Sequence, residues 1–236
     1  MTVPVQDRME PMDLFSNYDV LGAFWVTVQL TVYSAVGALV WGTVLAVMRV
    51  GPVPITRGFA AAYVTIFRNT PLTILVLFAS LGLASTLGIT LASAESTTSI
   101  AESTFRLAVL AFVVYTATFV CEAIRSGVNT VPVGQSEAAR ALGMGFGRVL
   151  ATIVLPQAFR SIISPLASIL IALTKNTTVA AVIGVGEAAL LMSEMVENES
   201  DVLFLVFALF ALGFVILTLP TGLLLGWVAR RLEVRR

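Results

Sequence analysis

The chain has 236 residues, of which 58% are hydrophobic and 12% are charged, and its 14 basic residues balance 14 acidic ones. Soluble domains carry about 25% charged residues, so this composition excludes an ordinary soluble protein and indicates a membrane protein. There is no histidine and only one cysteine, Cys121. These counts exclude serine–histidine catalysis, histidine metal sites and an internal disulfide bond, and we expect Cys121 to be a small core residue.

Charged residues lie between apolar runs of about 20 residues. At about 1.5 Å per residue, each run forms a helix long enough to cross a hydrocarbon core of roughly 30 Å. The runs do not alternate with period two, as the strands of membrane barrels do. The sequence therefore predicts an all-α polytopic membrane protein with five transmembrane helices, at residues 22–48, 71–92, 107–128, 162–185 and 202–228.

Arginines mark alternate connecting segments. They collect after the first span, after the third span and in the C-terminal tail, whereas the other segments are mainly acidic. Because cytoplasmic loops are enriched in Lys and Arg, we expect the N-terminus outside and the C-terminus in the cytoplasm. Residues 1–20 are then an extracytoplasmic N-terminal arm, either lying on the membrane surface or frayed. The arm is too acidic to begin a cleavable signal peptide, and residues 21–236 form one transmembrane domain.

The segment between the first two spans is apolar at residues 59–67 and ends in Arg68-Asn69-Thr70-Pro71-Leu72. Since residues 59–67 are too short to cross a bilayer, we place them at the cytoplasmic interface. Arg68 is either an interfacial anchor or a functional group at the start of the second span.

The third span ends in Cys121-Glu122-Ala123-Ile124-Arg125. Glu122 and Arg125 are three residues apart, so they share one helical face and can neutralise each other. Glu122 is therefore either a structural ion-pair partner or a contact for a transported substrate.

A polar segment at residues 130–160 interrupts the apolar spans. Thr130 and Pro132 favour a helix start, and Gly143 can adopt the left-handed conformation that ends a helix. A second helical run is expected to end near Pro156. Such a two-helix loop either caps its own bundle or docks onto another protein.

The fourth span is expected to start at Pro165 and contains Lys175, the only lysine of the chain, followed by Asn176-Thr177-Thr178. An ionisable group at the bilayer centre costs at least roughly 2.5 kcal/mol, so it is a functional candidate by default. Lys175 can instead hold two helices together through backbone carbonyls. In the last span, Pro220 can introduce a kink.

The polar segment carries a specific motif: Glu137-Ala138-Ala139, three residues, Gly143, nine residues and Ile153-Val154-Leu155-Pro156. The motif and its surroundings at residues 119–168 resemble the EAA loop of polar amino-acid ABC importer permeases. That branch serves histidine, glutamate, glutamine, arginine and opines, and the chain is most similar to glutamate or glutamine permeases. The resemblance implies a type I ABC importer permease fold whose cytoplasmic coupling (EAA) helices dock onto the ATPase. The implied coupling residues are Glu137, Ala138, Ala139, Arg140, Gly143 and Pro156.

The resemblance also implies partners and a substrate path. The expected partners are an ABC ATPase dimer that holds ATP and Mg, an identical or paralogous permease subunit, an extracytoplasmic amino-acid-binding protein and the lipid membrane. The segment at Arg68 resembles the family's R-G-T-P-L signature with Asn69 in place of glycine, and the segment at Lys175 resembles K-[DN]-T-[ST]. We expect the basic groups to attract a substrate carboxylate and the threonine hydroxyls to donate to it. The candidates are Arg68, Thr70, Glu122, Lys175, Thr177 and Thr178.

Other functions find less support in the sequence. The sole lysine is not followed by Ser or Thr, so there is no P-loop, and we expect this transport subunit to be no enzyme, with no cofactor or metal of its own. The arginines are too scattered for nucleic-acid binding. An ion- or proton-coupled secondary amino-acid transporter remains the alternative, although no inverted repeat is evident. An intramembrane hydrolase would need a serine partner for Lys175, and none stands out.

Overall fold

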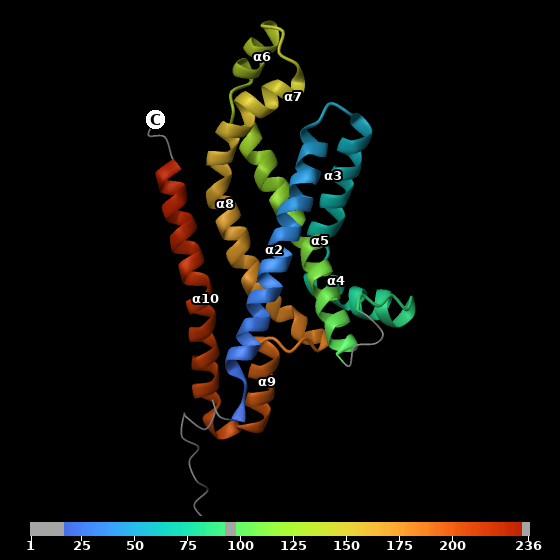
Figure 1. Cartoon of the computed structure of the whole chain (residues 1–236), viewed down its shortest axis with the longest axis vertical. Coiled ribbons are helices and arrows are strands. Elements are labelled where there is room, and N and C mark those ends of the chain that lie inside the picture. Colours follow the sequence, from blue (N-terminus) through green and yellow to red (C-terminus); the bar gives the residue numbers. More distant parts are fainter. Residues whose placement is uncertain (1–16, 93–97, 233–236) are drawn as a thin grey trace, which may run out of the picture.

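The computed structural model describes residues 17–92 and 98–232, and every regular element in these ranges is a helix (Figure 1). Residues 1–16 of the expected N-terminal arm, part of the loop before the third span and the last arginines lie outside the described residues. The α-helices are α2 Val20–Val50, α3 Pro54–Asn69, α4 Leu72–Leu77, α5 Ser99–Asn129, α6 Val133–Ala141, α7 Phe146–Val149, α8 Leu155–Asn176, α9 Ala188–Asn198 and α10 Leu203–Leu232. Short π-helical segments (η1 Phe78–Thr86, η2 Leu150–Val154) and 3-10 segments (η3 Thr177–Ile183, η4 Ser200–Val202) join some of them.

The centre of the bundle is the pair of long helices α2 and α5, which run side by side in Figure 1. Small residues let them approach closely: a methyl group added at Gly42 would lie 2.6 Å from Cβ of Val120, and one added at Gly37 would lie 2.5 Å from a methyl carbon of Val113. Helices in lipid associate through such close packing, because lipid gives no hydrophobic drive between them. Leu30, Leu107 and Phe112 fill the core beside this seam.

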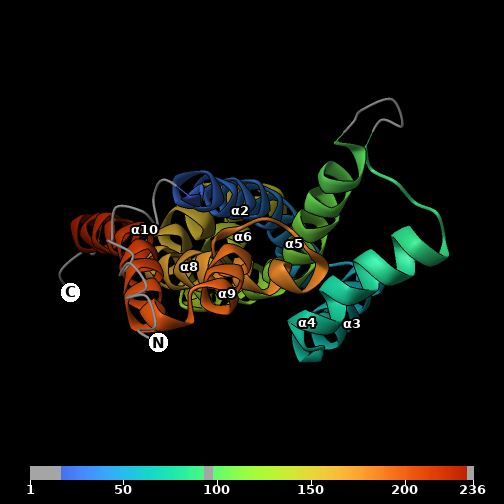
Figure 2. The same cartoon turned by 90° about the horizontal axis from the view of Figure 1, so that it is seen from below.

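The second predicted span differs from the structure. The helical run expected at 71–92 covers only Leu72–Thr86, and together with α3 it forms a pair bent by 102°. In addition, α3 packs against α2 and α5 through Ala60 and Val64, so residues 59–67 belong to the bundle. Pro71 and the extended backbone of Thr70 interrupt the helix here. Seen from below, the α4–η1 run points away from the other helices (Figure 2).

The fourth predicted span also starts elsewhere. Helix α8 begins at Leu155 and continues through Pro165, which therefore does not start the helix. Within the part of the chain that the structure describes, four helical runs are long and apolar enough to cross a membrane, namely Val20–Val50, Ser99–Asn129, Phe146–Ile183 and Ser200–Leu224. The bent pair makes a fifth when it is counted as one span, which agrees with the predicted number.

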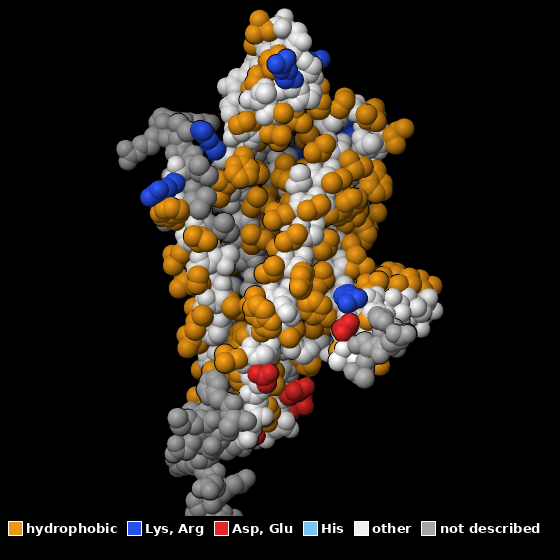
Figure 3. Space-filling model, in the orientation of Figure 1, with side chains coloured by type: hydrophobic (Ala, Val, Ile, Leu, Met, Phe, Trp, Pro, Cys, Tyr) orange, Lys and Arg blue, Asp and Glu red, His pale blue; other side chains and the backbone are white. Residues whose placement is uncertain are grey.

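The two ends of the molecule differ in charge. On the face shown in Figure 3, Lys and Arg side chains gather mostly in the upper part, Asp and Glu lie near the lower end, and hydrophobic side chains cover the middle. Helices α6 and α7 lie at the upper end, and α9 lies at the lower end (Figure 1). The distribution therefore matches the polarity that the sequence predicted for the two sides of a membrane.

Candidate functional site

The EAA segment forms two short helices, α6 and α7, that project from the upper end of the bundle (Figure 1). Gly143 follows α6 with φ +84°, which is the left-handed conformation predicted for it. Its N–H donates to the carbonyl of Arg140 at 2.9 Å, and the N–H of Met144 donates to the carbonyl of Ala139 at 3.1 Å. These two bonds form the Schellman motif that ends a helix at glycine.

Two boundaries of this loop differ from the expectation. Thr130 does not cap α6, because its hydroxyl donates to the carbonyl of Gly127 at the end of α5, and Pro132 stands at the N-cap position. The second helical run does not end at Pro156. It passes through the π-helical segment η2, where the N–H of Leu155 donates to the carbonyl of Leu150, and continues as α8. Pro156 lies in the first turn of α8, where the backbone N–H has no partner within the α-helix, so a proline is tolerated there.

The inner side of the loop is fixed to the bundle. Ala139 is buried against Val131, Val149, Val154 and Ala158. The side-chain amide of Gln157 on α8 donates to the side-chain carbonyl of Gln135 on α6 at 2.6 Å. The loop therefore holds its shape through its own contacts, as the capping interpretation expects.

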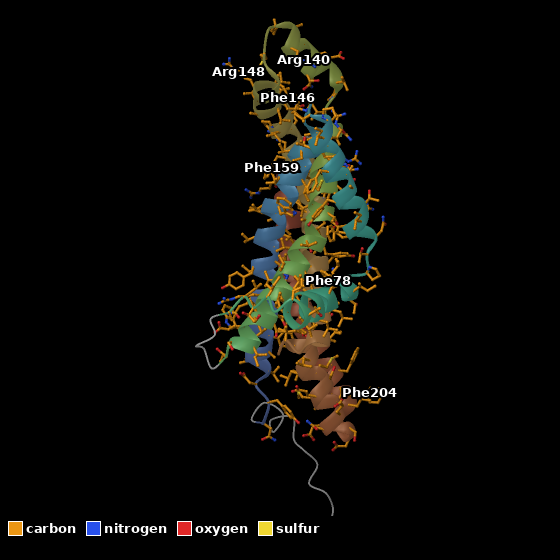
Figure 4. All side chains as sticks on the ribbon, turned by 90° about the vertical axis from the view of Figure 1, so that its right-hand side faces the viewer. Phe78, Arg140, Phe146, Arg148, Phe159 and Phe204 are labelled. Carbon is orange, nitrogen blue, oxygen red and sulfur yellow. The ribbon has the colours of Figure 1, made fainter. Side chains whose placement is uncertain are left out.

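The outer side of the loop is exposed. Glu137, Ala138 and Arg140 are exposed, and no ion pair joins Glu137 to Arg140 among the described residues. Two apolar side chains that the sequence argument missed lie on either side of Gly143: Leu142 is 85% exposed and Phe146 is 47% exposed. Figure 4 shows Arg140, Phe146 and Arg148 together near this tip. The sequence signal for Leu142 and Phe146 is that they are large apolar residues close to a turn glycine in an otherwise polar segment.

Below the loop, Glu122 joins two helices. Its Oε2 accepts from Nη2 of Arg125 at 2.9 Å, which confirms the predicted ion pair within α5. Its Oε1 accepts from Nη1 of Arg49 at 2.5 Å, and this bond links α5 to α2. Because both carboxylate oxygens are held by arginines, the geometry favours a structural role for Glu122 over direct contact with a substrate.

A cavity of about 280 Å³ lies between α5 and α8. Its walls include Thr116, Phe119, Ser168 and Asn176, so polar and aromatic groups face one space. The guanidinium of Arg68, in the last turn of α3, lies 5.8 Å from the centre of the Phe119 ring, within the range of a cation–π contact. Arg68 therefore contacts a wall residue of this cavity without lining it, and Lys175 directly precedes the wall residue Asn176 in the sequence.

Lys175 lies at the transition from α8 to the 3-10 segment η3, and its side chain is exposed. The three candidate threonines are not free donors. The hydroxyl of Thr70 donates to the carbonyl of Ile66 at 2.8 Å, that of Thr177 to Thr174 at 2.7 Å, and that of Thr178 to Lys175 at 2.8 Å. That these hydroxyls donate to a substrate carboxylate stays a prediction, and such donation would replace a bond to the helix backbone.

Comparisons with known proteins agree with this architecture. The family model described as "Binding-protein-dependent transport system inner membrane component" matches residues 38–234. The chain is 58% identical over 216 residues to the glutamate transport system permease protein GluC of Corynebacterium glutamicum, covering 92% of this chain and 95% of the relative. It is 30% identical to the probable glutamine ABC transporter permease protein GlnM of Bacillus subtilis, covering 93% and 96%. A solved structure titled "Crystal structure of an amino acid ABC transporter with histidines" matches with a TM-score of 0.80 at 23% identity, covering 95% and 99%.

Proposed function

Because the chain belongs to the family of inner-membrane components of binding-protein-dependent transport systems, we propose that it is the permease subunit of an ATP-driven importer of polar amino acids, with glutamate as the first substrate to test. It is a multi-pass inner-membrane protein and a transport subunit, and a separate subunit hydrolyses ATP. The observation that carries the proposal is the 58% identity to a glutamate permease across 92% of the chain. An ATPase and a substrate-binding protein are its partners, as the family description implies.

The projecting loop supports a specific way of coupling to the ATPase. Ala139 and Gln135 hold the inner side of the loop on the bundle, while Leu142 and Phe146 offer apolar surface on the outer side. Apolar side chains ringed by polar groups are typical of surfaces that bind another protein. The tip inserts into the ATPase, Gly143 sets the turn between its helices, and Glu137, Ala138 and Arg140 contact the rim. Pro156 begins α8, which carries movement of the tip into the membrane.

The assembly needs further components. Two copies of the ATPase bind ATP and Mg, and a second permease subunit, identical or paralogous, completes the membrane unit. The exposed apolar faces of α8 and α10 provide surface for this subunit and for lipid. An amino-acid-binding protein delivers the substrate at the acidic end of the bundle. The loop is then cytoplasmic, the N-terminus is outside and the C-terminus is inside.

The cavity between α5 and α8 is the proposed inner part of the substrate path. Arg68 beside Phe119, and Lys175 next to Asn176, supply positive charge for a substrate carboxylate that must lose its water. The hydroxyls of Thr70, Thr177 and Thr178 are the proposed donors to this carboxylate, and each would give up its present bond to a backbone carbonyl. Glu122 stabilises the cytoplasmic half of the path through its two arginines.

Reconstitution tests this function directly. We expect the chain to co-purify with an ATPase and, in liposomes supplied with the binding protein, to take up radiolabelled L-glutamate only when ATP is present on the ATPase side. Vanadate, which blocks ATP hydrolysis, should stop uptake, while dissipation of proton and sodium gradients should not. Uptake that follows an ion gradient and ignores ATP would overturn the proposal in favour of a secondary transporter.

A further inference from the structure

A second and larger cavity opens between the acidic-end halves of α2 and α5. Its volume is about 670 Å³, and the turn Gly184–Gly186 forms its third wall. Small-molecule sites commonly occupy about 300–1,000 Å³, with mostly apolar walls and a few polar groups. The walls here are mainly apolar, and their polar groups are Gln29, Tyr33, Glu102 and Arg106. The cavity therefore has the size and the lining of a site for a small molecule.

The charged groups of this cavity form a pair of opposite sign. Nη2 of Arg106 lies 3.3 Å from Oε2 of Glu102. Arg106 also donates to the carbonyl of Leu91, and Glu102 also accepts from the hydroxyl of Thr98 at 2.9 Å. A guanidinium has five N–H donors and a carboxylate has about four acceptor positions, so a bond to a ligand is compatible with several protein partners. A zwitterion matches the pair, with its carboxylate at Arg106 and its ammonium at Glu102.

Aromatic side chains line the cavity next to this pair. Tyr33 of α2 and Phe105 of α5 meet edge to face, with ring centres 6.1 Å apart. Rigid aromatic walls cover the aliphatic part of a ligand at little cost in conformational entropy, because they have few rotatable bonds. The amide of Gln29 adds one donor and one acceptor that can meet a polar side chain.

The two cavities lie in series along α5. The residues Phe105, Val109, Phe112, Thr116 and Phe119 are spaced by four, three, four and three, which places them on one face of the helix. Phe105 and Val109 line the outer cavity, whereas Thr116 and Phe119 line the inner one.

A buried apolar layer separates the cavities. Phe112 has no exposed surface and shares a core cluster with Leu173 and Val185. Val185 lines the outer cavity and Leu173 lines the inner one, so this cluster borders both spaces.

We propose that the outer cavity is a binding site for the zwitterionic head group of a free amino acid, occupied before the substrate passes the layer of Phe112, Leu173 and Val185. The inference rests on the proposed function, which supplies the substrate class and makes this end the entrance. A phospholipid such as phosphatidylethanolamine also carries a phosphate and an ammonium. The position in line with the inner cavity favours the free amino acid, because a lipid site would need no connection to a path through the bundle.

Protection of a thiol tests the site without depending on transport. Cys121→Ser removes the native thiol, and Ala101→Cys places one on the cavity wall, where Ala101 is exposed. In liposomes that contain the assembled complex with verified ATP-driven uptake, L-glutamate and glycine should slow labelling by an impermeant thiol reagent, and glutarate, which lacks the ammonium, should not. In this background, Glu102→Gln or Arg106→Gln should raise the glutamate concentration for half protection by roughly tenfold, the usual effect of losing one charge-assisted hydrogen bond.

Matched variants distinguish a zwitterion site from a general effect of charge or of loop structure. Glu197→Gln changes an exposed acid on α9 that does not line the cavity, and it should leave protection unchanged. Glu102→Gln leaves the carbonyl of Leu91 available to Arg106, whereas Arg106→Gln removes that bond, so a similar effect of both variants points to lost charge rather than to the contact with Leu91. The proposal is overturned if glutamate gives no protection in a complex that transports it, if glutarate protects equally, or if phosphatidylethanolamine in the vesicles slows labelling while amino acids do not. If the complex shows no ATP-driven uptake at all, the proposed function has failed instead.

Discussion

The hydroxyl oxygen of Thr27 on α2 lies 3.5 Å from Oε2 of Glu187, and neither residue has exposed surface. Oε1 of Glu187 accepts from the N–H groups of Ala189 and Leu190, both at 3.0 Å, and so caps α9. The N–H of Ala188 in turn donates to the hydroxyl of Thr27 at 3.1 Å. The carboxylate therefore fixes the start of α9 to α2 without a cation among the described ion pairs.

Protonation of Glu187 should change the stability of the protein. Glu187 lies beyond the fourth span, and burial raises the pKa of its carboxyl above the ordinary value of 4.5, although the hydrogen bonds from Ala189, Leu190 and Thr27 oppose this shift. A raised pKa means that the folded state binds the proton more tightly than the unfolded state. The contribution to stability is then full below pH 4.5 and is lost as the pH rises through the raised pKa.

Glu187→Gln should flatten this part of the pH profile, because the amide stays neutral and its oxygen can still cap α9. The measurement is the melting temperature of the purified complex across the acidic to neutral range. Glu194→Gln, which changes an exposed acid of α9, serves as the control and should keep the wild-type slope. Parallel curves for wild type and Glu187→Gln would show that this carboxyl is not linked to stability.

The helical class, the number of apolar runs and the turn at Gly143 could all be predicted from the sequence, because each depends on local rules. Hydropathy reports which segments avoid water, and a glycine that ends a helix is recognised from its neighbours. The pair between Glu122 and Arg125 is local as well, since three residues separate them. The link from Glu122 to Arg49 could not be predicted, because 73 residues separate the partners and only tertiary packing brings them together.

The bend after α3 shows where local rules failed. Hydropathy gives the length of an apolar run but not its direction, so it could not reveal that Leu72–Thr86 turns by 102° from α3. Local rules also placed a helix boundary where there is none. Pro165 was expected to start the fourth span, because proline breaks helices by local preference. Instead α8 continues through Pro165, since packing in the bundle outweighs one lost hydrogen bond.

The orientation of the chain can be tested by labelling single cysteines in intact cells. In a Cys121→Ser background, an impermeant thiol reagent should label Ser200→Cys directly, and should label Ala141→Cys only after the membrane is permeabilised. Both side chains are exposed, so access to solvent within the protein does not limit the reaction. Rapid labelling at Ala141→Cys in intact cells would place the EAA loop outside and contradict docking to a cytoplasmic ATPase.

Gly143→Asp should uncouple transport from ATP hydrolysis. Nothing lies within 4 Å of an added Cβ at Gly143, so the variant has space, but its φ of +84° strains any residue with a side chain. We expect at least a tenfold loss of uptake, as for a shift of about 1.4 kcal/mol in the docked geometry, while basal ATP hydrolysis continues. Gly134→Asp places the same side chain in open space on the same loop and has no left-handed backbone, so uptake should stay near the wild-type rate. Equal uptake by the two variants would mean that the turn at Gly143 is not needed for coupling.

Removal of the Glu122 carboxylate should destabilise the contact between α2 and α5. Glu122→Gln leaves Arg49 and Arg125 without an anion in a half-buried site, where their side chains are 22% and 37% exposed. Melting temperatures of Glu122→Gln, Arg49→Met and the double variant form a cycle, in which we expect a coupling of roughly 0.5–3 kcal/mol. Additive effects would show that the two helices are not held by this pair. A selective loss of glutamate affinity at unchanged stability would instead return Glu122 to the substrate path.

The last prediction concerns Arg68 and Lys175, the two basic candidates that lie near the cavity between α5 and α8 without lining it. Arg68 lies over the ring of Phe119, which lines that cavity, and Lys175 precedes Asn176, which also lines it. No carboxylate lies within 4.0 Å of either side chain among the described ion pairs, so both can pair with a substrate carboxylate.

Substitution of Arg68 or Lys175 by Met keeps apolar bulk and removes the charge. If these residues bind substrate, uptake should fall about tenfold, and the complex should still assemble and hydrolyse ATP at its basal rate. Arg57→Met is the matched control, because Arg57 is bonded to the carbonyls of Gly51 and Pro52 at the start of α3 and neither contacts nor adjoins a residue that lines the cavity. Failure of the Met variants to assemble would assign the residue a structural role as a membrane anchor. Unchanged uptake in both variants would show that neither charge is needed on the path.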